Sequence, residues 1–227
     1  MKKNKIVTRE EAIKVIKHGD RIMVGGFGQK GSPKYLIDAL GETDAKELTI
    51  ISNDLGSPGE GLGVLLRTNS IKALIGNYYN WNTEVADAFN AGQIDVTLLP
   101  QGNFAEAIRA GGVGIPAFYT KIGVGTELAE GKEIRTFGDE EYMLLESLVA
   151  DVAIIQADKA DELGNLVYER VARNFNPSMA TAAKTTIVEV SEIVPVGELD
   201  PECIVTQHIY VDYLVVREDK EDNHEGA

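Results

Sequence analysis

The chain has 227 residues, 44% hydrophobic and 26% charged, and a formal net charge of −14. It is long enough to bury a large core, and its composition excludes both general disorder and a fibrous repeat. The acidic balance argues against nucleic-acid binding, which depends largely on Lys and Arg contacts to phosphates. A single cysteine, Cys203, excludes an internal disulfide.

The N-terminal segment has none of the features of a targeting signal. Met1-Lys2-Lys3-Asn4-Lys5 is followed by polar and charged residues instead of an apolar stretch, so we expect no signal peptide. No apolar run reaches the roughly 18 residues of a membrane span. We therefore expect a soluble, cytoplasmic protein that binds neither membranes nor nucleic acid.

Short apolar segments alternate with amphipathic helical segments along most of the chain. Thr8 and Glu11 form a capping box for the first helix, and Ser32-Pro33 is expected to begin the second. Asn176 is expected to cap a helix that starts at Pro177. In chain order we predict a helix at 9–16, a strand at 21–24, a helix at 33–40, strands at 48–51 and 71–75, a helix at 83–90, a strand at 94–99, a helix at 105–110, a strand at 151–155, a helix at 177–183, and strands at 186–190 and within 206–216.

The predicted strands are apolar on both faces, which is typical of a parallel sheet covered on both sides by helices. We therefore predict a single α/β domain with a mostly parallel sheet over residues 1–216. A charged, disordered tail is expected over 217–227. The glycine-rich segment 111–125 is expected to be a loop or a tight hairpin.

A glycine-rich turn separates the first strand from the second helix. Gly26, Gly28 and Gly31 match the pattern G-x-G-x-x-G, and Asp54 follows at about the spacing of the ribose-binding acid of NAD-binding proteins. A phosphate, a carboxylate or a thioester oxygen would all suit free N–H groups at a helix N-terminus. A tight turn without a ligand is the alternative. The candidate cofactor-binding residues are Gly25, Gly26, Phe27, Gly28, Gln29, Lys30 and Gly31.

Two amide side chains follow predicted strands, at the edge where parallel sheets bind ligands. Asn53 follows the strand at 48–51, and Gln101 follows the strand at 94–99. Amides can donate hydrogen bonds to a carboxylate or a thioester carbonyl without carrying charge. Either residue alone could equally cap the next turn. Together with Asp54 they form the candidate substrate pocket.

The sequence offers no convincing catalytic group. It has neither a nucleophile elbow nor a Walker A loop, and His18, His208 and His224 lack partners at metal-ligand spacing. We therefore expect no metal site. Cys203 is expected to be a small buried hydrophobic residue instead of a nucleophile.

Three further residues receive no role. Glu60 and Glu127 lie in glycine-rich loops but have no evident partner there. Trp81 could wall a pocket or contact another protein chain, with a buried core position as the default. Loops suited to ligand binding, without a catalytic group, suggest that a partner protein supplies the chemistry.

Several segments, taken together, match the pattern of a known family: Gly25-Gly26-Phe27 with Gly31 and Pro33, Pro100-Gln101-Gly102, Gly123-Val124-Gly125-Thr126, and Ala172-Arg173-Asn174-Phe175-Asn176-Pro177. From about Thr8 to Val216 the chain resembles the alpha subunit of the family I CoA-transferases. The resemblance implies a short-chain acyl-CoA:carboxylate CoA-transferase of the acetate, acetoacetate or butyrate type. Coenzyme A or acyl-CoA would be a substrate, and no cofactor would be tightly bound.

The resemblance also implies a ping-pong mechanism. In the family, a beta-subunit glutamate attacks the thioester and becomes a glutamyl-CoA thioester by way of an acyl anhydride. That glutamate lies in a Ser-Glu-Asn-Gly stretch that this chain lacks, so no catalytic residue is expected here and a heterotetramer or larger complex is implied. The glycine loop would bind coenzyme A, with Asn53 and Gln101 lining the pocket. Asp54 departs from the pattern, because many members carry a second Asn there.

Two other functions compete with this one. The G-x-G-x-x-G pattern and Asp54 would suit an NAD-dependent oxidoreductase, although no His or Lys is credible as its proton donor. A non-catalytic module that binds coenzyme A is the third hypothesis.

Overall fold

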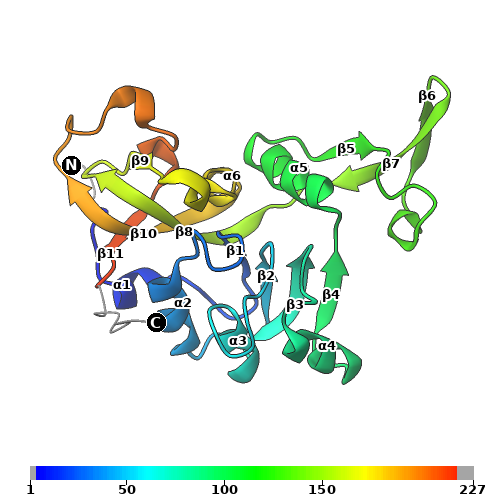
Figure 1. Cartoon of the computed structure of the whole chain (residues 1–227), viewed down its shortest axis with the longest axis horizontal. Coiled ribbons are helices and arrows are strands. Elements are labelled where there is room, and N and C mark those ends of the chain that lie inside the picture. The colour runs from blue at the N-terminus through cyan, green and yellow to red at the C-terminus, as the bar shows by residue number, and fades with distance from the viewer. Residues whose placement is uncertain (1–3, 219–227) are drawn as a thin grey trace, which may run out of the picture.

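The computed structural model describes residues 4–218 and arranges them in two sheets (Figure 1). Within that range the main sheet has eight strands, in the order β11-β10-β8-β1-β2-β3-β4 with β9 paired to β8. Every pair is parallel except β8–β9, which confirms the predicted sheet type. The strands are β1 (Arg21–Val24), β2 (Leu48–Ile51), β3 (Ile71–Gly76), β4 (Asp95–Leu98), β8 (Ala150–Asp161), β9 (Leu166–Val167), β10 (Ala183–Val194) and β11 (Tyr213–Val216).

Helices cover both faces of the main sheet, as predicted. Alternate residues of β1 show the division: Ile22 and Val24 belong to one buried cluster, and Met23 belongs to the other. Burial on both faces is what makes these strands apolar at nearly every position. The first face packs against α1 (Arg9–Ile13), α2 (Lys34–Gly41), α3 (Gly63–Arg67) and α4 (Thr83–Asn90), and the second packs against α5 (Gln101–Gly112) and α6 (Asn176–Thr181).

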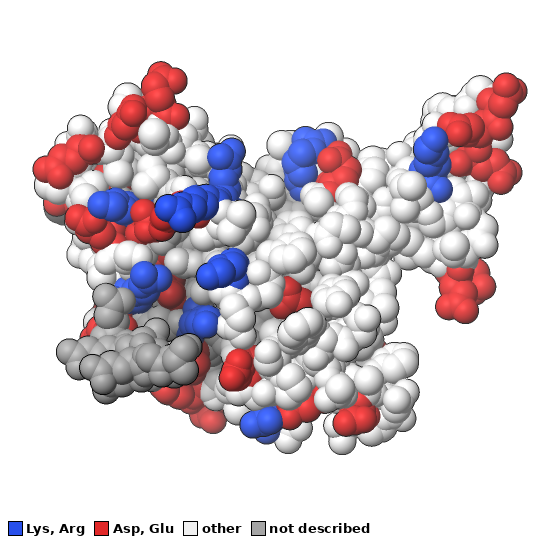
Figure 2. Space-filling view, in the orientation of Figure 1, with Lys and Arg blue, Asp and Glu red and all other residues white. Residues whose placement is uncertain are grey.

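A second sheet, which we call the wing, projects from the body beside α5 (Figure 1). It has the antiparallel order β5-β7-β6, with β5 at Ala117–Thr120, β6 at Ile134–Phe137 and β7 at Glu140–Glu146. The prediction of a loop or hairpin at 111–125 was wrong, because α5 continues to Gly112 and β5 begins at Ala117. Every residue of β6 is exposed, so it offers no apolar run to recognise. Acidic side chains crowd the far end of the wing (Figure 2).

The two ends of the described chain lie beside the main sheet. The backbone N–H of Val7 donates to Leu214 O at 3.0 Å, which attaches the N-terminal segment to β11. Arg217 N donates to Val190 O at 2.9 Å, so the first residue of the predicted tail continues the pairing of β11 with β10. Residues 219–227 of that tail lie outside the described residues. In residues 4–218 no helix is long and apolar enough to cross a membrane.

The N-terminus of α2 is capped differently from the prediction. Pro33, and not Ser32, is the cap residue, and no side chain of the turn caps the helix. Instead Glu189 of β10 reaches across, and Leu36 N donates to its Oε2 at 3.2 Å. Glu189 is only 2% exposed, and this burial raises the pKa of its carboxyl group to about 7.

This buried carboxyl group predicts a pH-dependent stability. Between its ordinary pKa of 4.5 and about 7, folded Glu189 holds a proton that the unfolded chain has released. Its stabilising contribution is therefore complete below pH 4.5 and lost as the pH rises through 7, by on the order of 3 kcal/mol. The backbone N–H groups of α2 and Arg217 oppose this shift, and Asp38 adds to it.

Urea unfolding of the wild type and Glu189→Gln between about pH 5 and pH 8 measures the effect. The amide keeps an acceptor for Leu36 N but cannot ionise, so the substituted protein is expected to gain stability relative to the wild type as the pH rises. Two parallel pH profiles would contradict the role of Glu189.

Candidate functional site

The predicted polar residues meet at the carboxyl ends of adjacent strands. The glycine loop, residues 25–31, follows β1, and Asn53 follows β2. Gln101 follows β4 and is the first residue of α5, which begins four residues earlier than predicted. Since parallel strands end at one edge of a sheet, these loops come together there. The structure adds Asn77, which directly follows β3. The sequence reasoning missed it, although Asn53 stands in a similar place, two residues after the end of β2.

A chain of side-chain hydrogen bonds joins these residues, and we call it the amide chain. Asn53 Nδ2 donates to Asp54 Oδ2 at 2.9 Å, and Gln101 Nε2 donates to Asn53 Oδ1 at 2.9 Å. Asn77 Nδ2 in turn donates to Gln101 Oε1. An ionised carboxylate only accepts hydrogen bonds, so Asp54 fixes which way Asn53 faces and hence the orientation of every later amide.

The three amides of the chain differ in what they offer a ligand. Asn53 is 2% exposed, whereas Gln101 is exposed and its amide nitrogen carries a second N–H. Asn77 Oδ1 is buried and has no hydrogen-bond partner among residues 4–218. Unsatisfied buried acceptors are uncommon, and a site that a ligand or partner completes is one reason for them.

Asp54 also ties two loops together. Its carboxylate accepts from Gly28 N at 2.7 Å and from Gly56 N at 3.0 Å, in addition to Asn53. These contacts hold the glycine loop against the segment after β2, with a small cleft between them. The Asp54 carboxylate is therefore hydrogen-bonded to the protein's own loops. In an NAD-binding protein, the acid at this position would instead bind the ribose.

The glycine loop uses much of its own hydrogen-bonding capacity. Phe27 and Lys30 exchange backbone hydrogen bonds at 3.0 and 3.2 Å, and Gly28 N is bonded to Asp54. At the following helix, Leu36 N donates to the Glu189 carboxyl group. A dinucleotide pyrophosphate needs the N-terminus of such a helix, and a buried carboxyl group already occupies this one. The geometry therefore counts against the NAD hypothesis.

Aromatic side chains stand exposed around the same edge of the sheet. Phe27 is 54% exposed, Tyr78 48% and Trp81 65%. The default core position for Trp81 was therefore wrong. Its indole Nε1 lies 3.4 Å from Ser57 Oγ, which places it at the loop after β2.

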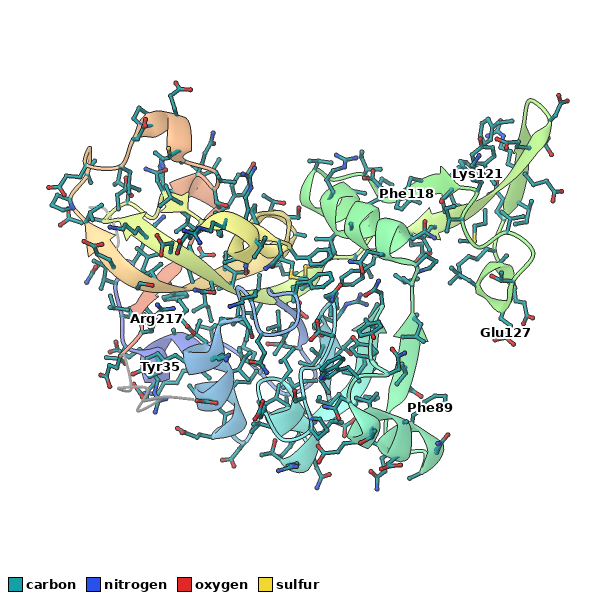
Figure 3. All side chains as sticks on the ribbon, in the orientation of Figure 1. Tyr35, Phe89, Phe118, Lys121, Glu127 and Arg217 are labelled. Carbon is teal, nitrogen blue, oxygen red and sulfur yellow. The ribbon has the colours of Figure 1, made fainter. Side chains whose placement is uncertain are left out.

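The glutamates without an assigned role are far apart. Glu60 Oε2 accepts a hydrogen bond from Gln29 Nε2 at 3.4 Å, so it lies beside the glycine loop. Glu127 begins a short 3-10 helix, Glu127–Ala129, between β5 and β6 of the wing, far from Tyr35 of α2 (Figure 3). Of the two, only Glu60 therefore belongs to the neighbourhood of the site.

The remaining candidates from the sequence do not form a site. Cys203 is exposed, contrary to the prediction, and the neighbouring Asp200 carboxylate raises the pKa of its thiol. The ring of His208 contacts Asn165 Oδ1 at 3.2 Å, and His224 lies outside the described residues. Within residues 4–218 no cluster of His, Cys, Asp and Glu could hold a metal ion.

Asn176 does not have its predicted role either. Phe175 is the N-cap residue of α6, and Asn176 is the first residue of the helix. Its side chain is fully buried and donates to Gly31 O at 3.0 Å. No local pattern could reveal this contact, because it joins residues 145 positions apart in the sequence.

A family model described as coenzyme A transferase matches residues 6–217. The chain is 49% identical over 207 residues to a probable succinyl-CoA:3-ketoacid coenzyme A transferase subunit of Bacillus subtilis, covering 91% of this chain and 87% of that one. It is 40% identical over 217 residues to the alpha subunit of acetate CoA-transferase from Escherichia coli, covering 96% and 99%. The chain therefore belongs to the coenzyme A transferase family, and the resemblance found in the sequence is confirmed.

Solved structures have the same fold. An acyl-CoA transferase from Escherichia coli O157:H7, in a thioester complex with CoA, superposes with a TM-score of 0.85 at 21% identity. The match covers 98% of this chain but only 49% of that one, so this chain spans about half of that enzyme's length. Glutaconate coenzyme A-transferase from Acidaminococcus fermentans gives a TM-score of 0.82 at 22% identity over 93% of this chain and 75% of its own. The two bacterial relatives above, each named as one subunit of a transferase, match this chain in length, and the predicted enzyme class, a CoA-transferase, is confirmed.

Asp54 supplies a stability prediction. In Asp54→Ala, the donors Gly28 N, Gly56 N and Asn53 Nδ2 lose their acceptor, which is expected to lower the free energy of unfolding by about 1–2 kcal/mol. Urea denaturation measures the loss. Glu60→Ala, which removes an exposed carboxylate with one long contact, is the control and should change stability by less than about 0.5 kcal/mol. Equal effects of the two substitutions would refute this role of Asp54.

Proposed function

We propose that this chain is the alpha subunit of a heteromeric short-chain acyl-CoA:carboxylate CoA-transferase. Its substrates would be acyl-CoA thioesters and acids of the acetate, acetoacetate or butyrate type. The observation that carries the proposal is the amide chain: it presents an exposed, uncharged donor, Gln101, and is joined to the glycine loop through Asp54. The names of the relatives, which include 3-ketoacid and acetate CoA-transferase subunits, support the same substrate class.

The carboxylates of this chain at the site are poorly suited to be the nucleophile. Asp54 accepts hydrogen bonds from three donors, which disperse its charge and hold it against its own loops. Glu60 is exposed at the rim. The attacking group is assigned to a glutamate of the beta subunit, as the resemblance to the family I CoA-transferases implies. The exposed side chains of Phe27, Tyr78 and Trp81 support a partner at this edge, because aromatic residues are common in protein interfaces.

In the proposed cycle, the glutamate attacks the thioester carbonyl and the CoA thiolate leaves, which forms an acyl anhydride. The thiolate then attacks the glutamyl carbonyl of the anhydride and releases the first carboxylate, which leaves a glutamyl-CoA thioester. A second carboxylate reverses these two steps. Each step creates a negative oxygen in its transition state, and its stabilisation is assigned to the second N–H of Gln101, the exposed amide of the chain.

The glycine loop, residues 25–31, is assigned to coenzyme A in this proposal. Gly28 has a backbone φ of 56°, and the space that a side chain would take there is open. The thioester end of the substrate can therefore approach the backbone closely at this point. Asn53 Oδ1 accepts a hydrogen bond from Gln101 Nε2 and so holds that side chain in place.

The proposal predicts that activity requires the partner. CoA transfer from acetoacetyl-CoA to acetate is expected to be absent with the purified chain and present when it is co-expressed with a beta subunit carrying the Ser-Glu-Asn-Gly stretch. Full activity of the single chain would disprove the assignment of the nucleophile. Inactivity of the pair with every short-chain acid tried would instead favour a non-catalytic coenzyme A-binding module.

Gln101 provides a second prediction. In the complex, Gln101→Ala should lower kcat by about 10²- to 10³-fold, the usual effect of removing a donor to a developing oxyanion, with a smaller change in KM. Gln93→Ala is the matched control, because Gln93 is an exposed glutamine that precedes β4, at the opposite end of the strand. Unchanged kcat in Gln101→Ala would exclude Gln101 as the stabilising donor.

A further inference from the structure

We propose that Asn174 and Asn176 are positioning residues for the glycine loop, which they hold in the shape that meets coenzyme A. The pair is called the asparagine clasp below. This inference rests on the proposed function for the identity of the ligand, but its structural basis is independent of it. The clasp lies between β9 and β10 in the sequence, in and just before α6, and reaches the loop from the far half of the chain.

Asn176 holds the C-terminal end of the loop. Its Nδ2 donates to Gly31 O at 3.0 Å and to Ala172 O at 2.9 Å. Its Oδ1 accepts from Gln156 N of β8 at 3.0 Å. The side chain is fully buried, and every one of these partners is backbone. The residue therefore fixes the loop relative to the central sheet without depending on any mobile side chain.

Asn174 holds both ends of the loop at once. Gly26 N donates to its Oδ1 at 3.1 Å, and its Nδ2 donates to Lys30 O at 3.0 Å. The backbone of Asn174 has a φ of 21°, outside the regions that L-residues favour. Such conformations persist only where surrounding contacts enforce them, and they concentrate at functional sites.

The clasp also explains two of the loop's glycines. A side-chain carbon at Gly25 would lie 1.8 Å from Asn176 Oδ1, and one at Gly31 would lie 2.6 Å from Asn174 Nδ2 and 2.2 Å from Ala172 O. These positions must be glycine so that the clasp can approach the backbone. Gly28 has nothing within 4 Å of the same point. The protein therefore occupies one side of the loop, and the side at Gly28 is the one left to a ligand.

The chemistry of the clasp requires an amide. Asn176 Nδ2 faces two carbonyl oxygens, so an aspartate would place a negative oxygen against both of them. Asn174 likewise faces backbone N–H groups with its oxygen and carbonyl groups with its nitrogen. An uncharged side chain with both a donor and an acceptor satisfies each of these groups at once.

Asn174→Gly tests the clasp with little disturbance of the backbone, because glycine tolerates a positive φ. In the complex with the beta subunit, the KM for acyl-CoA is expected to rise about tenfold, with a smaller change in kcat. Asn69→Gly is the matched control: Asn69 has a φ of 50°, is exposed and lies away from the loop, so its KM should not change. If the wild-type complex is active and Asn174→Gly leaves the KM unchanged, the role of the clasp is refuted while the proposed function stands.

Hydrogen exchange of residues 25–31 in the single chain tests the clasp without any activity. Asn174→Gly and Asn176→Asp should both speed exchange in this segment by at least about tenfold. In the first variant Gly26 N loses its acceptor, and in the second Gly31 O loses its donor. Asn165→Ala controls for a general loss of stability, since Asn165 makes comparable contacts to Asp161 and His208 at another site. Unchanged exchange in the loop would refute the clasp even if the proposed function were wrong.

Discussion

Burial of the main sheet on both faces is the constraint on which the rest of the structure depends. Once the residues of β1, β2 and β8 are apolar on both sides, polar groups can gather only where the strands end. Asn53, Asn77 and Gln101 stand just beyond the ends of three neighbouring strands, and they meet for that reason. The candidate site is thus a consequence of the topology, with its chemistry determined by which residues follow each strand.

A single carboxylate, that of Asp54, determines how the amide side chains at this edge are oriented. The Asp54 carboxylate can only accept hydrogen bonds, so Asn53 must turn its nitrogen toward it. This orientation leaves the Asn53 oxygen to accept from Gln101, whose own oxygen then accepts from Asn77. The same carboxylate holds Gly28, so the orientation of the amides and the position of the glycine loop are coupled. A substitution at this residue therefore affects two elements that look independent in the sequence.

The sequence predicted features whose cause is local. The boundaries of β1 and the capping box of α1 agree with the structure, because burial on both faces and the Thr8–Glu11 pairing each leave a pattern within a few residues. The wing was missed because β6 is exposed and β5 is half-buried at every position, so neither strand shows a buried apolar alternation. The cap of α2 was assigned to Ser32, whereas the actual partner is Glu189, 153 residues away from Leu36. Asn176 was assigned to a helix cap for the same reason: long-range contacts leave no signal in one sequence.

The carboxyl group of Glu189 at α2 has a consequence for ligand selectivity. In a nucleotide-binding turn the helix end directs several parallel N–H groups at one dianionic phosphate. Here that positive end is compensated from within the protein. The backbone N–H groups of the glycine loop are also bonded within the protein, Gly26 N to Asn174 and Gly28 N to Asp54. This turn therefore offers a dianionic phosphate far fewer free N–H groups than a nucleotide-binding turn does.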